Sequence, residues 1–179
     1  MSQIGTNYAQ ALYGLAAEEG AADTVLSQLA SLDAAFSQEP DFLKLLAAPN
    51  ISKQERCGIL DKSFRDKVHP YVLNFLKLLT EKGYICHFPD CCKQFREQYN
   101  AEHGILSVRA VTATALTEAQ REKLTRKLAA ITGKTVELTV RVDPTVLGGV
   151  RLDYDGKRLD GTVRNRLDTI GNLLKNTVL

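Results

Sequence analysis

The residues with the clearest capacity for chemistry form a short cluster in the middle of the chain, at Cys86, His87, Cys91 and Cys92. Thiolates and imidazole are good ligands for zinc. The spacing differs from the paired C-x₂-C arrangement of common zinc sites, and adjacent cysteines on a helix point about 100° apart. Both side chains would therefore rarely reach one ion. We favour free thiols, including Cys57, over a zinc site and expect no metal.

Two further segments resemble ligand-binding loops but lack necessary parts. Residues 133–135 (Gly-Lys-Thr) resemble the end of a phosphate-binding loop. That loop needs a glycine where Leu128 stands, and it runs from strand to helix, the reverse of the order expected here. Residues 153–156 (Asp-Tyr-Asp-Gly) resemble the start of a calcium loop, but no glutamate closes it, and a hairpin turn explains them better. The sequence indicates no reaction and no cofactor, so we expect a protein that is not an enzyme.

Charge is distributed unevenly along the chain. The 179 residues include 23 basic and 21 acidic side chains, a formal net charge of +2. Residues 1–104 carry 10 basic and 13 acidic residues, whereas residues 105–179 carry 13 and 8. The total gives no reason to expect nucleic acid or a membrane as the main partner. The difference between the halves suggests two modules with different partners, although chance drift in charge explains it about equally well.

The sequence also lacks signals for membrane insertion or export. No apolar run approaches the ~18 residues of a transmembrane helix. The N-terminus has neither the basic start nor the apolar stretch of a signal peptide. We therefore expect a soluble, cytosolic chain.

Helical periodicity dominates residues 1–104. The first expected helix carries apolar residues on one face at Ile4, Tyr8, Leu12 and Leu15. Ser52 and Glu55 form a capping box that begins a later helix. Pro70 fits a first helical position, Gly83 fits the end of that helix, and Pro89 opens another. Six helices joined by short loops are expected, which predicts a compact bundle.

Strand periodicity appears after residue 105. Apolar and polar residues alternate over 106–110, 136–142 and 150–154, as in half-buried strands. Thr117 and Gln120 form a capping box for a helix between the first two strands. The Asp-Gly pair at 155–156 favours a tight hairpin turn into a fourth strand at 157–160. A last amphipathic helix carries Val163, Leu167, Ile170 and Leu174.

Together these patterns predict an α+β fold of two domains. Residues 1–104 form the six-helix bundle, and residues 105–179 form a small α/β module with the order β-α-β-β-β-α. The boundary coincides with the change in charge near residue 105.

The most specific segment is the glycine-rich run at residues 140–174. Its distinguishing residues are Val142-Asp143-Pro144, Leu147-Gly148-Gly149-Val150, and Leu159-Asp160-Gly161-Thr162-Val163 with Arg164 and Leu167. This pattern resembles the C-terminal signature of the delta subunit of F-type ATP synthases, the family of the oligomycin-sensitivity-conferring protein. The run Tyr8-Ala9-Gln10-Ala11-Leu12 resembles the opening of that family more weakly. The resemblance covers nearly the whole chain.

The resemblance implies a non-catalytic subunit of the peripheral stalk, which keeps the catalytic head from turning with the rotor. In the family, the N-terminal bundle binds N-terminal helical segments of the alpha subunits, and the C-terminal module meets the C-terminal ends of subunit b. Membrane association would be indirect, through other subunits, at the cytoplasmic face of a bacterial cell membrane.

The resemblance also places a helix-binding groove between the first and fifth helices, residues 4–18 and 70–82. The expected lining residues are Tyr8, Ala11, Leu12 and Leu15 on one side and Phe75, Leu78 and Leu79 on the other. Leu12 and Leu79 fit the bundle core as well as they fit a groove. Ala11 and Leu78 lie off the main apolar stripes, so we favour these two as surface contacts.

Partner contacts of the second module are less defined. The hairpin and the last helix are candidates for binding subunit b, although burial of the helix against the module's own sheet is the stronger alternative. A different class of function is a helical adaptor whose basic α/β module binds nucleic acid. The basic residues are not interleaved with aromatic residues for base stacking, so we expect no nucleic-acid partner.

Overall fold

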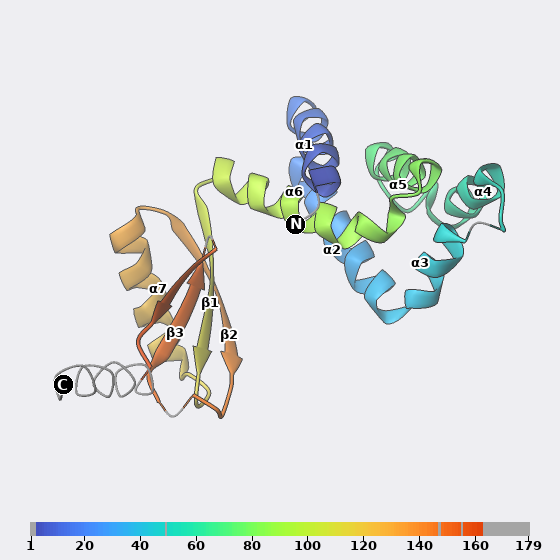
Figure 1. Ribbon diagram of the computed structural model, residues 1–179. Coiled ribbons are helices and arrows are strands. Elements are labelled where there is room, and N and C mark those ends of the chain that lie inside the picture. The colour runs from blue at the N-terminus through green and yellow to red at the C-terminus, as the bar shows by residue number, and fades with distance from the viewer. Residues whose placement is uncertain (1–2, 49, 147, 155, 163–179) are drawn as a thin grey trace, which may run out of the picture. The chain divides into compact units, whose positions relative to one another are not determined.

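The structure is a computed structural model that describes residues 3–48, 50–146, 148–154 and 156–162 (Figure 1). These residues form α-helices and a four-stranded sheet, which confirms the α+β class. The chain divides into two compact units, residues 1–99 and 100–179. This division falls within the last turn of helix α6 (Phe88–Glu102), slightly before the boundary expected after residue 104.

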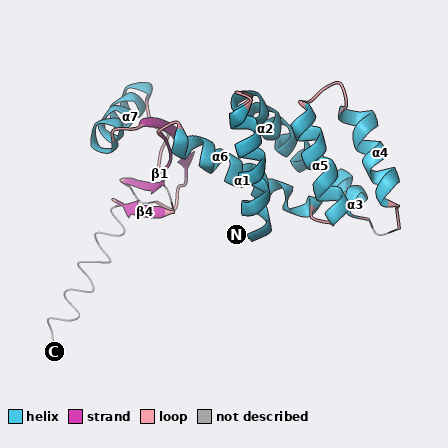
Figure 2. Ribbon diagram, turned by 90° about the horizontal axis from the view of Figure 1, so that it is seen from above, coloured by secondary structure: helices cyan, strands magenta, loops and turns pink. Residues whose placement is uncertain are grey.

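Short connections join the helices of the first unit (Figure 2). They are α1 (Gln3–Glu18), α2 (Ala22–Gln38), α3 (Pro40–Ala47), α4 (Lys53–Phe64), α5 (Pro70–Lys82), the short 3-10 helix η1 (Ile85–His87) and α6. Within the part of the chain described, no helix combines the length and the apolar character that crossing a membrane requires.

Local signals set several helix ends as expected. The Ser52 hydroxyl accepts a hydrogen bond from the Glu55 amide at 3.2 Å, and the Glu55 carboxylate accepts one from the Ser52 amide at 3.1 Å. This reciprocal pair satisfies backbone donors that the first turn of α4 would otherwise leave unpaired. Pro70 begins α5, and Gly83 ends it with a φ of 77°, a conformation that favours glycine.

Helix α6 begins within one residue of the expected start at Pro89, but a 3-10 turn precedes it. The chain leaves α5 into the 3-10 turn η1, and α6 then begins at Phe88. The side chains of Ile85 and Phe88 are both fully buried. Burial of these two apolar residues in the core explains why ordered structure begins before the proline.

Aromatic contacts tie the core of the first unit together. The Phe36 ring of α2 stacks on Phe42 of α3 at 5.6 Å and meets Phe88 of α6 edge-on at 5.2 Å. Tyr13 of α1 meets Phe95 of α6 edge-on at 5.3 Å. Such offset and edge-on pairs add stability beyond the area they bury. Segments distant in sequence are thus packed around one hydrophobic core.

The second unit contains a mixed sheet with the strand order β2-β1-β3-β4. The strands are β1 (Ile105–Thr112), β2 (Thr135–Val142), β3 (Val150–Tyr154) and β4 (Lys157–Asp160). β1 pairs in parallel with β2 and antiparallel with β3. β3 and β4 form the predicted hairpin, with Tyr154 opposite Lys157 across a two-residue connection.

Helix α7 (Glu118–Thr132) connects β1 to β2 and covers one face of the sheet. Its Leu124 and Leu128 pack on the buried Leu106, Val108 and Ala110 of β1. Ile131, expected on the same face, is 81% exposed and is not among the residues packed on the sheet. The last helix of the expected β-α-β-β-β-α order lies outside the described residues.

Candidate partner-binding site

Helices α1 and α5 lie against each other and are joined near both ends. Near the start of α1, the Tyr8 ring approaches the Tyr84 ring, which follows α5, at 6.1 Å between centroids. Just after the end of α1, the Glu19 carboxylate accepts a hydrogen bond from the Tyr71 hydroxyl at the start of α5. The two helices therefore run in opposite directions. Because the rise per residue is the same in both helices, Leu78 lies at the same height along the pair as the stretch of α1 around Tyr13.

The structure separates the seven predicted groove residues into two groups. Leu12, Phe75 and Leu79 are 4%, 4% and 0% exposed and belong to the core. These three therefore support the surface from beneath and are not available to a partner, a correction to the expected lining. The other four reach the surface: Tyr8 is half-buried, and Ala11, Leu15 and Leu78 are exposed.

We call the surface formed by Tyr8, Ala11, Leu15 and Leu78 the α1–α5 strip. Leu15 is 49% exposed and Leu78 is 39% exposed, although both are large apolar side chains. Tyr84 was not predicted to belong here, yet its ring packs on Tyr8 beside the strip. Its position directly after Gly83, where α5 ends, was the available signal. Because these apolar side chains are left partly in water on adjacent helices, the strip is a candidate surface for binding a partner.

The signature residues of the second unit fix the connection from β2 to β3. The Asp143 carboxylate accepts hydrogen bonds from the Thr145 amide at 3.0 Å and from the Thr145 hydroxyl at 2.6 Å. These bonds hold the pKa of Asp143 below its ordinary value. Pro144 lies two residues after Val142, the last residue of β2, as expected for a residue that cannot donate a ladder hydrogen bond.

Gly149 and Gly161 bring two backbone segments into close approach. The φ of Gly149 is +85°, and a Cβ atom there would lie 2.5 Å from the Gly161 carbonyl oxygen and 2.9 Å from the Thr162 Cα. The Gly161 amide donates to the Val150 carbonyl at 3.1 Å. Gly148 has a φ of 150°. Gly149 is thus required by the fold of this unit, and the φ of Gly148 also favours glycine.

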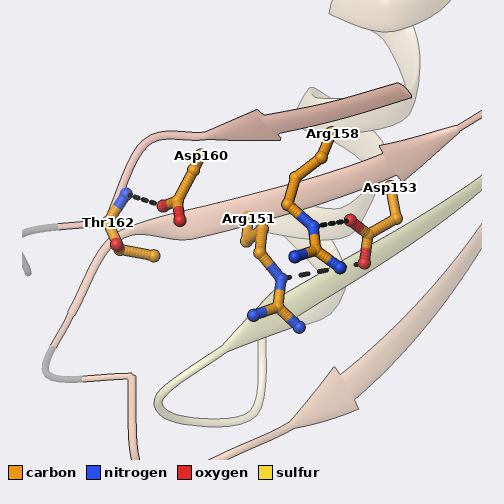
Figure 3. A network of polar contacts seen from close by, with 5 residues as sticks. All are labelled: Arg151, Asp153, Arg158, Asp160 and Thr162. Atoms are coloured by element: carbon orange, nitrogen blue, oxygen red, sulfur yellow. Dashed lines mark hydrogen bonds and ion pairs between the residues drawn. The ribbon is translucent and has the colours of Figure 1, made fainter. Parts of the chain in front are cut away.

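Asp160 completes the signature next to this contact. Its carboxylate accepts a hydrogen bond from the Thr162 amide at 2.9 Å (Figure 3). Hydrogen bonding by Thr162 lowers the pKa of Asp160. Leu147, Val163, Arg164 and Leu167 of the signature lie outside the described residues.

All four cysteines lie among the described residues and are free. Cys86 is exposed and Cys57 is half-buried, whereas Cys91 and Cys92 are buried. Burial, with the Asp90 carboxylate nearby, raises the pKa of Cys91 to about 11. Burial also raises the pKa of Cys92, whose thiol donates to the Leu29 carbonyl at 3.8 Å. Among the described residues, no three Cys, His, Asp or Glu side chains are grouped to hold a metal ion.

Thiol labelling should follow this division. At neutral pH we expect Cys86 to react first with iodoacetamide, because it is exposed. Cys91 should react far more slowly, since a pKa of about 11 instead of 9 leaves about 100-fold less thiolate. Mass spectrometry of the alkylated native chain measures both rates, and Cys86→Ser should abolish the fast phase. Equal labelling of Cys86 and Cys91 before unfolding would contradict this assignment.

The fold and the surface together define a class of protein. The first unit exposes apolar side chains on two adjacent helices, and the signature residues of the second unit serve its own backbone. These features are typical of a subunit that acts by binding other proteins. A family model described as ATP synthase delta (OSCP) subunit matches residues 4–174. The chain belongs to this family.

Sequence relatives agree along the full length. The chain is 32% identical to ATP synthase subunit delta of Alkaliphilus oremlandii, over 98% of both chains. It is 34% identical to ATP synthase subunit delta of Erythrobacter litoralis, over 97% of this chain and 95% of that one.

A solved structure shares the fold. A chain of the Toxoplasma gondii mitochondrial ATP synthase hexamer superimposes with a TM-score of 0.79 and is 22% identical, covering 97% of this chain and 98% of that one. At this identity the likeness establishes the fold alone.

Proposed function

We propose that this chain joins the catalytic head of the F-type ATP synthase to the stalk subunit b. As a member of the delta family it is a non-catalytic subunit of the peripheral stalk. In the proposal, residues 1–104 act as a six-helix bundle that binds the N-terminal segments of the alpha subunits. Residues 105–179 act as the module that contacts subunit b. The exposed apolar side chains of the α1–α5 strip are the observation that carries the proposal.

The α1–α5 strip suits an amphipathic helix as its partner. Such a helix presents apolar anchors every three or four residues, which can pack on Leu15 and Leu78 while its polar face stays in water. Ala11 lies on the same helix and carries only a methyl group, so a partner backbone can approach closely there. The core residues beneath the strip hold it rigid, which lowers the entropy lost on binding.

The location of the chain follows from its partners. In the proposal it lies at the cytoplasmic face of a bacterial cell membrane and associates with the membrane only through other subunits. Its mechanical task is to resist the torque that the rotor exerts on the head, so that rotation drives ATP synthesis.

Enlarging Ala11 tests the first contact. We expect Ala11→Arg to weaken binding of a peptide from the alpha-subunit N-terminus by about 10-fold, because the long charged side chain would occupy the approach of the partner helix. The bundle should stay folded, since Ala11 is exposed. Isothermal titration calorimetry measures the affinity, and circular dichroism measures the melting temperature.

Ala17→Arg is the matched control, because Ala17 is also exposed on α1 but lies on another side of the helix. The control should bind like the natural chain. Unchanged affinity in Ala11→Arg would contradict the role of the α1–α5 strip.

Recovery of partners tests the proposal as a whole. The full chain, tagged and expressed in its native host, should recover the alpha and b subunits from the membrane fraction, as identified by mass spectrometry. Absence of both would overturn the proposed function.

A further inference from the structure

The sheet of the second unit carries one arginine from each strand on the face opposite α7. Arg109 of β1 lies between Val108 and Ala110, which face α7, so its own side chain points to the other face. Arg109 is opposite Asp153, which is opposite Arg158 of β4. Two residues further along β1, Val111 lies on the same face, and it pairs with Arg141 of β2 on one side and with Arg151 of β3 on the other. Residues that pair across the strands in this way form a row. We call the surface formed by Arg109, Arg141, Arg151 and Arg158 the arginine face.

Two of these arginines are held by an aspartate. The Arg158 Nε lies 2.8 Å from one Asp153 carboxylate oxygen, and the Arg151 Nε lies 3.7 Å from the other (Figure 3). Asp153 and Arg151 are each 28% exposed at the side chain, so the pair is partly withdrawn from water. Arg158 has a pKa raised by its hydrogen bond to Asp153.

The other two arginines, Arg109 and Arg141, are exposed and are not held by an aspartate in the same way. Within the described ranges, neither Arg109 nor Arg141 forms an ion pair at 4.0 Å or less with a carboxylate. Arg141 acts at longer range, where its charge helps to lower the pKa of Asp143. On the two rows that span all four strands, the face thus presents four arginines and two aspartates, Asp153 and Asp160, and Glu137 of β2 lies one row away. Its surplus is positive, and the strands hold it in a fixed geometry.

We infer that the arginine face binds an acidic protein segment, with Arg109 and Arg141 pairing with glutamate or aspartate side chains of the partner. The planar guanidinium group presents two parallel donors that match a carboxylate. This inference rests on the proposed function, because it names the chemistry of the partner that the second unit takes.

The charges on the arginine face also favour an acidic protein segment over a nucleic acid or residues 163–179 of this chain. Asp153 and Asp160 interrupt the arginines and would repel a continuous phosphate backbone, whereas separate carboxylates can fit between them. The aromatic residue of the described strands, Tyr154, pairs with Val108 on the α7 side and leaves no stacking platform among the arginines. Residues 163–179 of this chain carry three basic residues and one acidic residue, so their charge does not complement the face.

A charge-matched pair of variants tests the inference. The probe is a synthetic helical peptide rich in glutamate, and its glutamine counterpart is the control probe. We expect Arg109→Gln with Arg141→Gln to weaken binding of the glutamate peptide to the full chain by about 10-fold at low salt. Lys123→Gln with Lys127→Gln removes the same charge from exposed positions of α7 and should change the affinity less than about 2-fold.

Other outcomes would overturn the inference. Equal loss in both double variants would show attraction by net charge alone. Tighter binding of a single-stranded oligonucleotide or of phosphatidylserine vesicles than of the glutamate peptide would favour a phosphate ligand. Self-association that the arginine variants abolish, measured by analytical ultracentrifugation, would assign the face to a second copy of this chain.

The recovery experiment separates failure of the inference from failure of the proposed function. If the natural chain recovers alpha and b subunits and the arginine variant recovers as much b, only the inference fails. If the natural chain recovers neither subunit, the proposed function fails whatever the peptide does. Loss of b with retained affinity for the alpha peptide supports both.

Discussion

Gly149→Ala is expected to destabilise the second unit by about 3 kcal/mol. The φ of +85° costs about 1–2 kcal/mol for a residue that carries a Cβ atom. The new methyl group would also lie 2.5 Å from the Gly161 carbonyl oxygen, which is backbone and can move only with its strand. Relief of such a clash adds about 1–3 kcal/mol. Hydrogen exchange of the β1 and β3 amides measures the loss.

Gly156→Ala is the control for this prediction. Gly156 has a similar φ of +71°, but a Cβ atom there would meet nothing within 4 Å. It should cost only the conformational part, about 1–2 kcal/mol. The first unit should keep its melting behaviour in both variants. Equal losses at Gly149 and Gly156 would show that the close approach to Gly161 is unimportant.

Leu79→Ala should mainly lower stability and Leu78→Ala should mainly weaken partner binding, although the residues are neighbours on α5. Leu79 is fully buried, so its truncation should cost about 2–5 kcal/mol through lost contacts and the cavity left behind. Leu78 is 39% exposed, and its truncation should cost less than about 1 kcal/mol. If Leu78 anchors a partner helix, Leu78→Ala should still weaken binding of the alpha-subunit peptide by about 10-fold.

Urea unfolding of the first unit and calorimetric titration with the peptide measure the two effects separately. Each variant serves as the control for the other. A Leu78→Ala chain that binds normally, or that unfolds as readily as Leu79→Ala, would contradict the division of α5 into a core face and a partner face.

Local signals made much of the fold predictable. The capping boxes at Ser52 and Thr117 and the glycine at the end of α5 act within one turn of helix, so the nearby sequence contains the information. The hairpin between β3 and β4 was predictable for the same reason. The 3-10 turn η1 before α6 was not, because it depends on burial of Ile85 and Phe88 among residues far away in sequence.

The order of the strands in the sheet could not be predicted from the sequence either. Alternation identifies a strand and its buried face, but it does not specify the neighbours. The central place of β1, with a parallel partner on one side and an antiparallel partner on the other, results from packing of the whole unit.

The candidate site shows the same limit at the level of one helix. The sequence placed Leu12 and Leu15 on a common apolar face. The core side of α1 is instead formed by Ala9, Leu12, Tyr13 and Ala16, which leaves Leu15 half in water. Alanine carries little hydrophobic weight in a periodicity analysis, yet it permits the close approach of neighbouring helices that fixes the orientation of α1. The surface position of Ala11 and Leu78 could be predicted because both residues lie off the main apolar stripes of their helices.

The central position of β1 has a mechanical consequence. Only His103 and Gly104 separate α6 from β1, so tension carried along the chain from the helical unit enters the sheet at an inner strand. β1 pairs with β2 over its whole length on one side and with β3 over residues 108–112 on the other. A pull along this strand strains many hydrogen bonds at once in shear, whereas a pull on an edge strand would open them one after another. In a machine that works against torque, the chain enters its second unit through the strand best able to bear a load.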